Sequence, residues 1–253
     1  MKISVVTAVW NRASTIGDSL TSLSGQTYQN VEHVVQDGAS SDGTLDIIAA
    51  HPFANRQMVS EKDGGIYDAL NRGFARASGD VVGLLHSDDY FADADVLARV
   101  AEAFGDPAVQ AVYGDLDYVA AEDTDRVVRH WQAGDFAADK LAKGWMPPHP
   151  TLFLRRSVIE ECGLFDTSFR IAADYDAILR YFSQPGFDAA YIPHVLVKMR
   201  LGGASNASLR HILRKSLEDH TALRKNKVGG MGTLAAKNLQ KIPQFLRRSR
   251  AEA

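Results

Sequence analysis

Two adjacent carboxylates, Asp88 and Asp89, stand directly after a short apolar run at residues 81–85 and beside the hydroxyl of Ser87. Because like charges repel, such a pair is stable where a cation or a set of donors lies between the two groups. Oxygen ligands without Cys or His favour a hard ion, Mg²⁺ or Mn²⁺, which often shares its coordination with substrate phosphates. Capping of a helix over residues 94–104 by Asp89 or Asp93 is an ordinary alternative. The pair alone leaves both interpretations open.

The elements that would position these carboxylates alternate between strand and helix. Apolar β-branched runs predict strands, and capped amphipathic stretches predict the helices between them. Strands are expected at residues 3–9, 31–36, 57–60 and 81–85, and helices at 15–24, 44–50, 66–77 and 94–104. This alternation is typical of an α/β fold in which a mostly parallel, Rossmann-like sheet is flanked by helices on both faces.

Polar residues follow all four predicted strands. In an α/β sheet of this kind, ligands bind outside the carboxyl ends of the strands. We therefore expect four polar segments to meet in one crevice: Thr7–Arg12, Asp37–Ser41, Asp63–Gly65 and Ser87–Asp89.

The crevice lacks the common nucleotide-binding loops, since no G-x-G-x-x-G follows the first strand and no Walker sequence occurs. Asp37 could accept hydrogen bonds from a base N–H or from ribose hydroxyls. Gly64 and Gly65 permit close approach of a ligand to the backbone, although a plain turn explains two glycines equally well. Together with the carboxylate pair, these features indicate a nucleotide diphosphate held through a divalent ion.

Length and composition limit the class of protein. The 253 residues, 45% of them hydrophobic and 23% charged, suit one large domain with or without a tail. The single cysteine, Cys162, excludes an internal disulfide and fits a reducing compartment. The chain starts with strand sequence rather than a signal peptide, and no apolar run approaches transmembrane length. A cytoplasmic protein without a nucleic-acid partner is expected.

Charge divides the chain into an acidic body and a basic tail. From Ala204 onward there are 11 Lys and Arg against 3 Asp and Glu, whereas residues 1–203 contain 17 against 28. The tail pattern is helical from Ser208, breaks at residues 229–232 and resumes over 234–246. A basic amphipathic helix can lie on an anionic membrane surface. Helices packed on the body, or on a second subunit of a homo-oligomer, fit the pattern equally well.

Several motifs, in order along the chain, resemble those of family 2 glycosyltransferases, which are inverting, nucleotide-sugar-dependent enzymes with the GT-A fold. The matching segments are Ser4–Arg12, Gln26–Tyr28, Glu32–Thr44, Asp63–Gly73 and His86–Asp89. In detail they most resemble small bacterial enzymes that build exopolysaccharide and lipopolysaccharide repeat units. The resemblance covers about residues 3–203. It implies a GT-A domain over residues 1–203, with a donor half to about residue 110 and an acceptor half over 111–203, followed by the basic helical tail over 204–253.

The resemblance also implies roles in the donor half. The first strand end would line the nucleoside pocket, Asp37 would bind the base, and the third strand end would lie along the ribose and diphosphate. The carboxylate pair stands at the position of the family's DxD motif, with Asp89 as the more direct metal ligand and Asp88 nearer the ribose. The implied donor-binding residues are Thr7, Ala8, Trp10, Asn11, Asp37, Asp63, Gly64, Gly65, Ser87 and Asp88.

One position departs from the family pattern. His86 stands where many members of the family have a carboxylate. Weaker metal binding, a contact of His86 with the nucleotide, and a packed, hydrogen-bonded histidine are the three interpretations that the sequence leaves open.

In the acceptor half, the stiff turn Trp145–Thr151 resembles a segment that faces the acceptor, which makes Trp145 and His149 candidates for acceptor binding. A rigid connector with a stacked Trp is the alternative. The chain around Asp174 resembles the helix that carries the catalytic base, usually written Glu-Asp, with Ala173 in place of the Glu. A carboxylate favoured by the helix dipole is the alternative for Asp174.

Two further features of this half are expected. The strand over residues 111–118 is expected to turn outward at Gly114. The last strand, residues 191–200, ends at Arg200, and the Gly-Gly pair at 202–203 would suit a loop that closes over the donor. Arg200 or Lys198 would then clamp the diphosphate. A flexible exit into the tail explains the same residues.

The resemblance implies an inverting transfer of a sugar, from an expected UDP-linked donor, to a glycan or lipid-linked glycan acceptor. Asp174 would deprotonate the acceptor, and Mn²⁺ or Mg²⁺ at the carboxylate pair would stabilise the departing diphosphate. A sugar nucleotidyltransferase would require a Gly-rich basic loop after the first strand, which residues 8–13 lack. The intact carboxylates disfavour a non-catalytic nucleotide-sugar binder or assembly scaffold.

Overall fold

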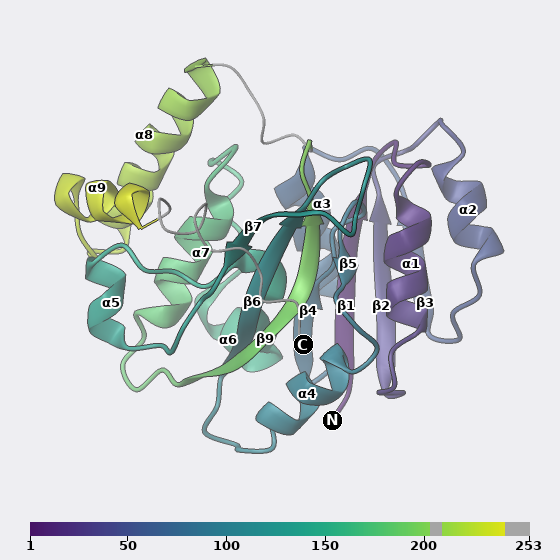
Figure 1. Ribbon diagram of the computed structural model, residues 1–253, viewed down its shortest axis with the longest axis horizontal. Helices are drawn as coiled ribbons and strands as arrows, with labels where there is room; N and C mark the ends of the chain where they lie inside the picture. The colour runs from purple at the N-terminus through teal and green to yellow at the C-terminus, as the bar shows by residue number, and fades with distance from the viewer. Residues whose placement is uncertain (203–208, 241–253) are drawn as a thin grey trace.

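The computed structural model describes residues 1–202 and 209–240, which form one mixed sheet with helices on both faces (Figure 1). In this part of the chain the sheet has nine strands. Their order is β3 (Arg56–Ser60), β2 (Val31–Asp37), β1 (Ile3–Val9), β4 (Val81–Leu84), β8 (Phe153–Arg155), β6 (Ala111–Val119), β9 (Ala189–Arg200) and β5 (Tyr90–Phe91), with β7 (Val127–Trp131) paired to β6. The α/β class predicted from the sequence is confirmed.

The pairing of the strands differs between the two halves of the sheet. Strands β3, β2, β1 and β4 pair in parallel, as the alternation of elements predicts. Strand β8 runs antiparallel between β4 and β6 and so joins the halves, and β9 lies parallel to β6. Every residue of β1 and β2 is buried, which is typical of parallel strands covered on both faces.

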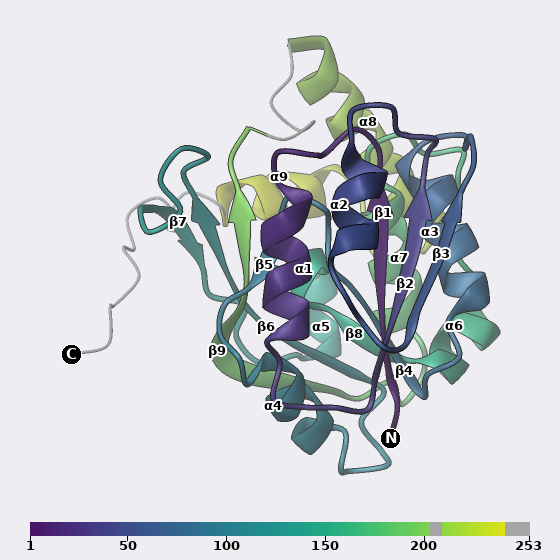
Figure 2. The same ribbon diagram turned by 90° about the vertical axis from the view of Figure 1, so that its right-hand side faces the viewer.

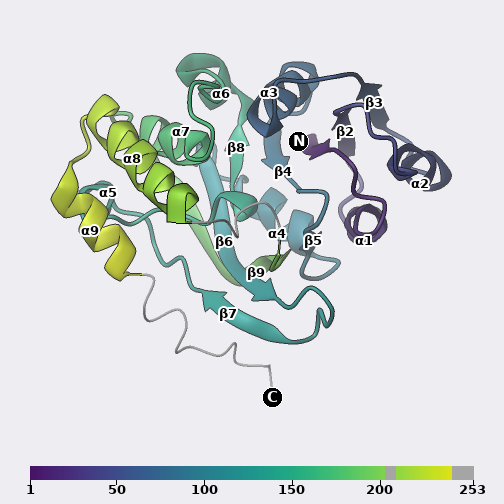
Figure 3. The same cartoon turned by 90° about the horizontal axis from the view of Figure 1, so that it is seen from above.

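Helices cover the sheet in two layers, as Figures 2 and 3 show. Helices α1, α2 and α4 lie on one face, and α3, α6 and α7 lie on the other. The bounds are α1 (Ile16–Ser24), α2 (Thr44–Ala50), α3 (Ile66–Arg76), α4 (Val96–Ala103), α5 (Ala138–Ala142), α6 (Arg156–Cys162), α7 (Ala173–Phe182), α8 (Leu209–Lys225) and α9 (Met231–Leu239), with a 3-10 turn at His149–Thr151.

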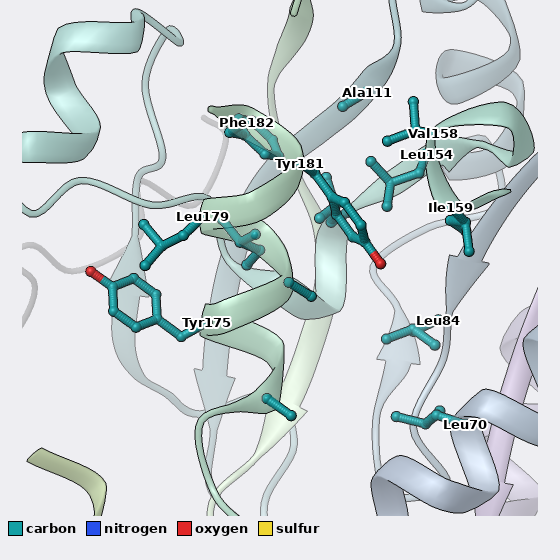
Figure 4. Packing of buried hydrophobic residues seen from close by; sticks show 14 of the residues in the cluster. Leu70, Leu84, Ala111, Leu154, Val158, Ile159, Tyr175, Leu179, Tyr181 and Phe182 are labelled. Carbon is teal, nitrogen blue, oxygen red and sulfur yellow. The ribbon is translucent and has the colours of Figure 1, made fainter. Parts of the chain in front are cut away.

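Helix α7 lies at the centre of the larger core (Figure 4). Its fully or nearly fully buried side chains include Tyr175, Leu179 and Phe182. Val158 and Leu154 pack in the same cluster from α6 and β8. This burial fixes α7 against the sheet, and with it the carboxylate at the start of the helix.

Strand β6 corrects the expectation of an outward turn at Gly114. The strand continues to Val119, and its register with β9 shifts on either side of Asp115. A Cβ on Gly114 would lie 2.5 Å from Leu196 Cγ and 2.8 Å from the carbonyl oxygen of His194. The glycine therefore permits a close approach of β9 rather than a turn.

Helices α8 and α9 pack against the body of the protein. Ala222 and Leu223 of α8 and Leu234 of α9 belong to the same core cluster as α7. The hydroxyl of Thr233 donates to the carbonyl oxygen of Ala142 over 2.8 Å. Packing on the body was one of the alternatives for this segment; the predicted helical stretch beyond residue 240 lies outside the described residues.

Candidate active site

The polar strand ends meet at one edge of the sheet, as the parallel pairing requires. Val9 is in register with Asp37, and Asp37 with Ser60. The N–H of Asn11 donates to Ser40 Oγ over 2.8 Å, and Thr15 Oγ1 donates to the carbonyl oxygen of Ser87 over 3.1 Å. The first and second predicted segments are thus in direct contact, and the fourth contacts the start of the helix that follows the first.

Asp37 offers one unused acceptor atom in this crevice. Its Oδ2 accepts hydrogen bonds from the N–H of Ser40 over 2.9 Å and from Ser60 Oγ over 2.6 Å. Its Oδ1 is buried and has no hydrogen-bond partner among the described residues. A buried acceptor without a partner is costly, so this oxygen is suited to a donor from a ligand.

The four residues predicted to line the nucleoside pocket differ in their burial. Thr7 and Ala8 are buried inside the sheet, and the Thr7 hydroxyl donates to the carbonyl oxygen of Leu85 over 2.8 Å. Trp10 is exposed, and Asn11 has a left-handed backbone with φ of 50°. At this strand end the Trp10 side chain is exposed, whereas Asn11 is half-buried and its Oδ1 accepts from the N–H of Ser41 over 2.9 Å.

The third strand end lies against the first. Asp63 Oδ1 accepts from the N–H of Gly65 over 2.9 Å. A Cβ on Gly38 would lie 2.7 Å from Asp63 Oδ2 and 3.4 Å from Trp10 Cβ, so the absence of a side chain at Gly38 lets these segments meet. Gly64 is exposed, and Gly65, also exposed, has φ of 117°. The backbone of the two glycines is therefore accessible beside Asp63.

The carboxylate pair lies between β4 and β5. Asp89 is 1% exposed, and its Oδ2 has no hydrogen-bond partner in the described chain. Burial raises the pKa of Asp89 well above its usual range, and the charge of Asp88 adds to the effect, while Arg200 opposes it. A buried carboxylate that stands beside a second acid and has one oxygen without a donor is the environment expected for a cation ligand.

Arg200 contacts this loop from the end of β9. Its guanidinium donates to the carbonyl oxygen of Asp88 over 3.3 Å and lies over the Tyr90 ring at 5.3 Å. It also forms an ion pair with Asp18 of α1. Arg200 therefore holds the carboxylate loop, and Gly203, the second member of the predicted hinge, lies outside the described residues.

Asp174 stands in the first turn of α7 and has two side-chain partners. Its Oδ2 lies 3.2 Å from His149 Nδ1, and its Oδ1 accepts from the Tyr67 hydroxyl over 3.2 Å. The side chain remains 21% exposed. Burial raises the pKa of Asp174, but His149 and the charges of Lys215 and Lys237 outweigh this effect and hold the pKa below the usual value. Asp174 is therefore ionised and oriented.

A pair of histidines connects Asp174 to the carboxylate loop. His149 Nε2 lies 3.2 Å from His86 Nε2. The other ring nitrogen of His149, Nδ1, faces Asp174 Oδ2, so the imidazole lies between His86 and the carboxylate, and the ring tautomers set which histidine donates to the other. Burial lowers the pKa of His86 to about 4, with His149 adding to the effect. Of the three interpretations of His86, the structure has the packed, hydrogen-bonded histidine.

Trp145 lies apart from this group. Its indole N–H donates to the carbonyl oxygen of Ala133 over 2.8 Å, and its ring contacts those of Tyr113, Phe136 and Phe182. This is the packing role that the sequence allowed as the alternative to acceptor binding, whereas His149 of the same turn contacts Asp174.

Sequence reasoning gave no role to three residues of this region. Tyr67 lies inside a motif that was recognised, but nothing in the sequence indicates that its hydroxyl reaches Asp174. Asp18 and Glu218 come from distant helices and contact Arg200 and the start of α7, respectively. No group of three or more His, Cys, Asp or Glu side chains that could hold a metal occurs in residues 1–202 and 209–240.

Comparisons with known proteins agree with this geometry. The model for "Glycosyl transferase family 2" matches residues 4–163. A "PGL/p-HBAD biosynthesis glycosyltransferase" of Mycobacterium bovis is 34% identical over 226 residues, covering 87% of this chain and 85% of the relative. An uncharacterized glycosyltransferase of Mycobacterium tuberculosis is 34% identical over 181 residues, covering 70% of this chain and 68% of the relative.

Two solved structures share the fold. Residues 1–349 of S. aureus TarS, in complex with UDP-GlcNAc, give a TM-score of 0.69 at 18% identity, covering 90% of this chain and 66% of that one. The chain spans 43% of a longer TarS structure. A mannosyltransferase from Pyrobaculum calidifontis, in complex with GDP-Man and Mn²⁺, gives 0.67 at 20% identity, covering 97% and 73%.

Fold and sequence together define a glycosyltransferase of the GT-A type. The chain belongs to glycosyltransferase family 2. The family, the fold and the enzyme class expected from the motifs are confirmed. None of the helices within residues 1–202 and 209–240 has the length and apolar character needed to cross a membrane.

Proposed function

We propose that the protein transfers a sugar, with inversion, from a UDP-linked donor to a glycan or lipid-linked glycan, and that Asp174 is the general base. The observation that carries the proposal is the chain of contacts from Asp174 through His149 to His86, which stands two residues before Asp88. This chain brings a candidate base and a candidate diphosphate site into one crevice.

Donor binding is supported by the strand ends. Asp37 Oδ1 is a buried acceptor that a base N–H or a ribose hydroxyl would satisfy. Trp10 offers an exposed ring beside it, and Gly64 and Gly65 offer backbone without a Cβ. The TarS structure with UDP-GlcNAc and the mannosyltransferase structure with GDP-Man, which share the fold, support a nucleotide sugar as the ligand.

A divalent ion fits the carboxylate pair. Asp89, with its unpartnered Oδ2, and Asp88 would hold Mn²⁺ or Mg²⁺, and donor phosphate oxygens would supply further ligands because the described chain offers no third side chain. The ion, when bound, neutralises charge that develops on the diphosphate. The Mn²⁺ in the mannosyltransferase structure supports this assignment.

Asp174 has the chemistry of a base for this transfer. The acceptor O–H proton passes to the Asp174 carboxylate while the acceptor oxygen bonds to the anomeric carbon. The bond from that carbon to the diphosphate breaks, and its electron pair leaves on the diphosphate oxygen. The contacts with His149 and Tyr67 hold the carboxylate in place, and its exposed part would receive the acceptor proton. An α-linked donor would give a β-glycoside.

The outer face of α8 supports a lipid-linked acceptor and a place in the cytoplasm at the inner face of the membrane. Leu213 and Leu217 are 65% and 69% exposed. Arg214 and Arg224 are exposed on the same helix. Exposed leucines flanked by arginines suit the surface of an anionic bilayer.

The test measures products and binding together. The protein is incubated with Mn²⁺ and each of UDP-glucose, UDP-GlcNAc, UDP-galactose and GDP-mannose, and released nucleotides are quantified. We expect nucleoside diphosphate, and a raised melting temperature with UDP and Mn²⁺. Asp174→Asn should keep the melting shift and lose about 10²-fold or more in release rate. Pyrophosphate as product would indicate nucleotidyl transfer, and binding without release would indicate a non-catalytic binder.

A further inference from the structure

The turn that leads into α7 presents three successive backbone N–H groups, those of Arg170, Ile171 and Ala172. The helix itself offers no side-chain cap, because its N-cap position is Ala172. N–H groups at the start of a helix have no partner within the helix, so they require another acceptor. The helix dipole favours an anion at this position.

Glu218 of α8 supplies that acceptor from outside the helix. Its Oε2 lies 3.1 Å from the nitrogen of Arg170, 2.7 Å from that of Ile171 and 3.1 Å from that of Ala172. Its Oε1 accepts from Arg214 Nε over 3.0 Å. Burial raises the pKa of Glu218, but these N–H groups and Arg214 outweigh the effect and lower it. One charged carboxylate therefore holds the turn that leads into α7, including the N–H of the N-cap residue Ala172.

The capped turn is also held from the opposite side. Tyr67 of α3 donates to the carbonyl oxygen of Ile171 over 2.7 Å, and the same hydroxyl contacts Asp174 Oδ1. Glu218 therefore holds the backbone N–H groups of this turn. Tyr67, which also contacts Asp174, holds the carbonyl group of Ile171 in the same turn. A shift of this turn would move both Asp174, which follows Ala172 by two residues, and its hydroxyl partner.

Helix α8 is attached to α7 at a second point. Lys225 Nζ lies 3.1 Å from Asp176 Oδ2 and 2.8 Å from Asp166 Oδ2. Asn226 donates to Asp176 Oδ1 over 2.9 Å, and Asp176 is fully buried. Since α8 is anchored here, the position of Glu218 is set by the packing of the whole helix.

We propose that Glu218 is a positioning residue for Asp174, acting through the turn at residues 170–172, so that α8 is a working part of the transferase site. The proposal rests on the proposed role of Asp174 as the base. It assigns α8 a function in turnover in addition to the membrane contact proposed for its outer face.

The test compares Glu218→Ala, Glu218→Gln and a matched control. Glu160→Ala removes an exposed glutamate that also pairs with an arginine four residues away, Arg156, over 3.0 Å, but caps nothing at α7. Three quantities are measured for the full chain: amide hydrogen exchange of residues 170–172, the melting shift with UDP and Mn²⁺, and kcat and KM for transfer.

We expect Glu218→Ala to exchange these amides about tenfold faster or more and to lose about tenfold or more in kcat, with KM for the donor and the nucleotide shift unchanged. Glu218→Gln keeps an acceptor oxygen and should lie between Glu218→Ala and wild type. Glu160→Ala should match wild type in all three measurements.

Unchanged kcat in Glu218→Ala would overturn the proposal, and so would a loss of kcat matched by an equal loss of nucleotide binding, which indicates general destabilisation. If wild type shows no turnover although the amide exchange responds as expected, the base role of Asp174 fails, and Glu218 is left as a structural cap only.

Discussion

Asp89 carries an unpartnered buried oxygen next to a second carboxylate, an arrangement that weakens the folded state unless a ligand compensates for it. Asp174 has the opposite character, because His149 and nearby lysine charges stabilise its ionised form. At the scale of single residues, therefore, one carboxylate is suited to hold a cation and the other to accept a proton.

Replacement of Asp89 should stabilise the ligand-free protein and weaken its binding of UDP with Mn²⁺. Asp89→Asn removes the charge that faces Asp88, so we expect the ligand-free protein to gain about 1 kcal/mol, or roughly 2–4 °C in melting temperature. The same variant should lose the melting shift with UDP and Mn²⁺. Thermal denaturation with and without ligand checks both effects. A ligand-dependent shift equal to that of wild type would contradict the metal assignment.

Removal of His149 should change the pH dependence of turnover. Asp174 accepts a proton only when ionised, so activity falls as pH decreases through its pKa. The pKa lies below the usual value because His149 and two lysines oppose the effect of burial. In His149→Ala the effect of burial is less opposed, so the acid limb of kcat should move to higher pH, and kcat should fall about tenfold or more.

The control for this experiment is His51→Ala, because the hydrogen bond described for the His51 ring is to the surface residue Ser24. Its pH profile should match wild type. An acid limb that is the same in wild type and in His149→Ala would show that His149 does not act on Asp174.

At the scale of residues, the site residues that stand in local motifs could be predicted. Those that contact partners far away in the sequence could not. The carboxylate pair, Asp174 and His149 stand in local motifs. Tyr67, Glu218 and Asp18 act on partners 107, 46 and 182 residues away, and no local pattern marks a contact at such separation.

At the scale of elements, strands β1, β2 and β4 were predictable because each contains buried β-branched residues and is followed by polar residues. Gly114 was misjudged because its reason for being glycine is the approach of Leu196 from β9, which the sequence around Gly114 does not reveal. Helix α8 was ambiguous since its two faces differ: Ala222 and Leu223 are buried, whereas Leu213 and Leu217 are exposed.

Charges on the outer face of α8 test the proposed membrane contact. Burial of one leucine contributes about 1.5–3 kcal/mol, so Leu213→Glu with Leu217→Glu should weaken association with anionic liposomes roughly a hundredfold. Cosedimentation measures this effect, and the melting shift with UDP should persist. Met58→Glu is the control, because Met58 is exposed on β3, at the opposite end of the molecule from α8 (Figure 1). Equal sedimentation of both variants would exclude α8 as the contact.

The attachment of α9 depends on a buried charge. Lys237 Nζ lies 2.9 Å from Asp219 Oδ2 and 3.2 Å from the centre of the Tyr175 ring. Lys237→Ala leaves the buried Asp219 with Lys215, at 3.2 Å, as its remaining lysine partner, and should lower the free energy of unfolding by about 2 kcal/mol. Urea denaturation measures the loss. Lys143→Ala removes an exposed pair with Asp139 and should change stability by less than about 0.5 kcal/mol. Equal losses would contradict a structural role for Lys237.

At the scale of the whole molecule, the site lies between two halves that share one sheet. Asp37, Asp63 and Asp89 come from the first hundred residues, whereas His149 and Asp174 come from the second half. Strand β8 joins the halves through ladders to β4 and β6. We expect a single unfolding transition, with calorimetric and van't Hoff enthalpies equal, because neither half has a complete sheet without the other. Two resolved transitions would contradict this expectation.

The position of β8 also has a consequence for synthesis of the chain on the ribosome. Strand β4 ends at residue 84, but its neighbour on one side consists of residues 153–155. Until those residues emerge, the nascent chain carries an apolar strand with one open edge, which is a template for pairing with other chains. Nascent chains stopped near residue 110 should therefore require a chaperone, and release of residue 155 should end that requirement.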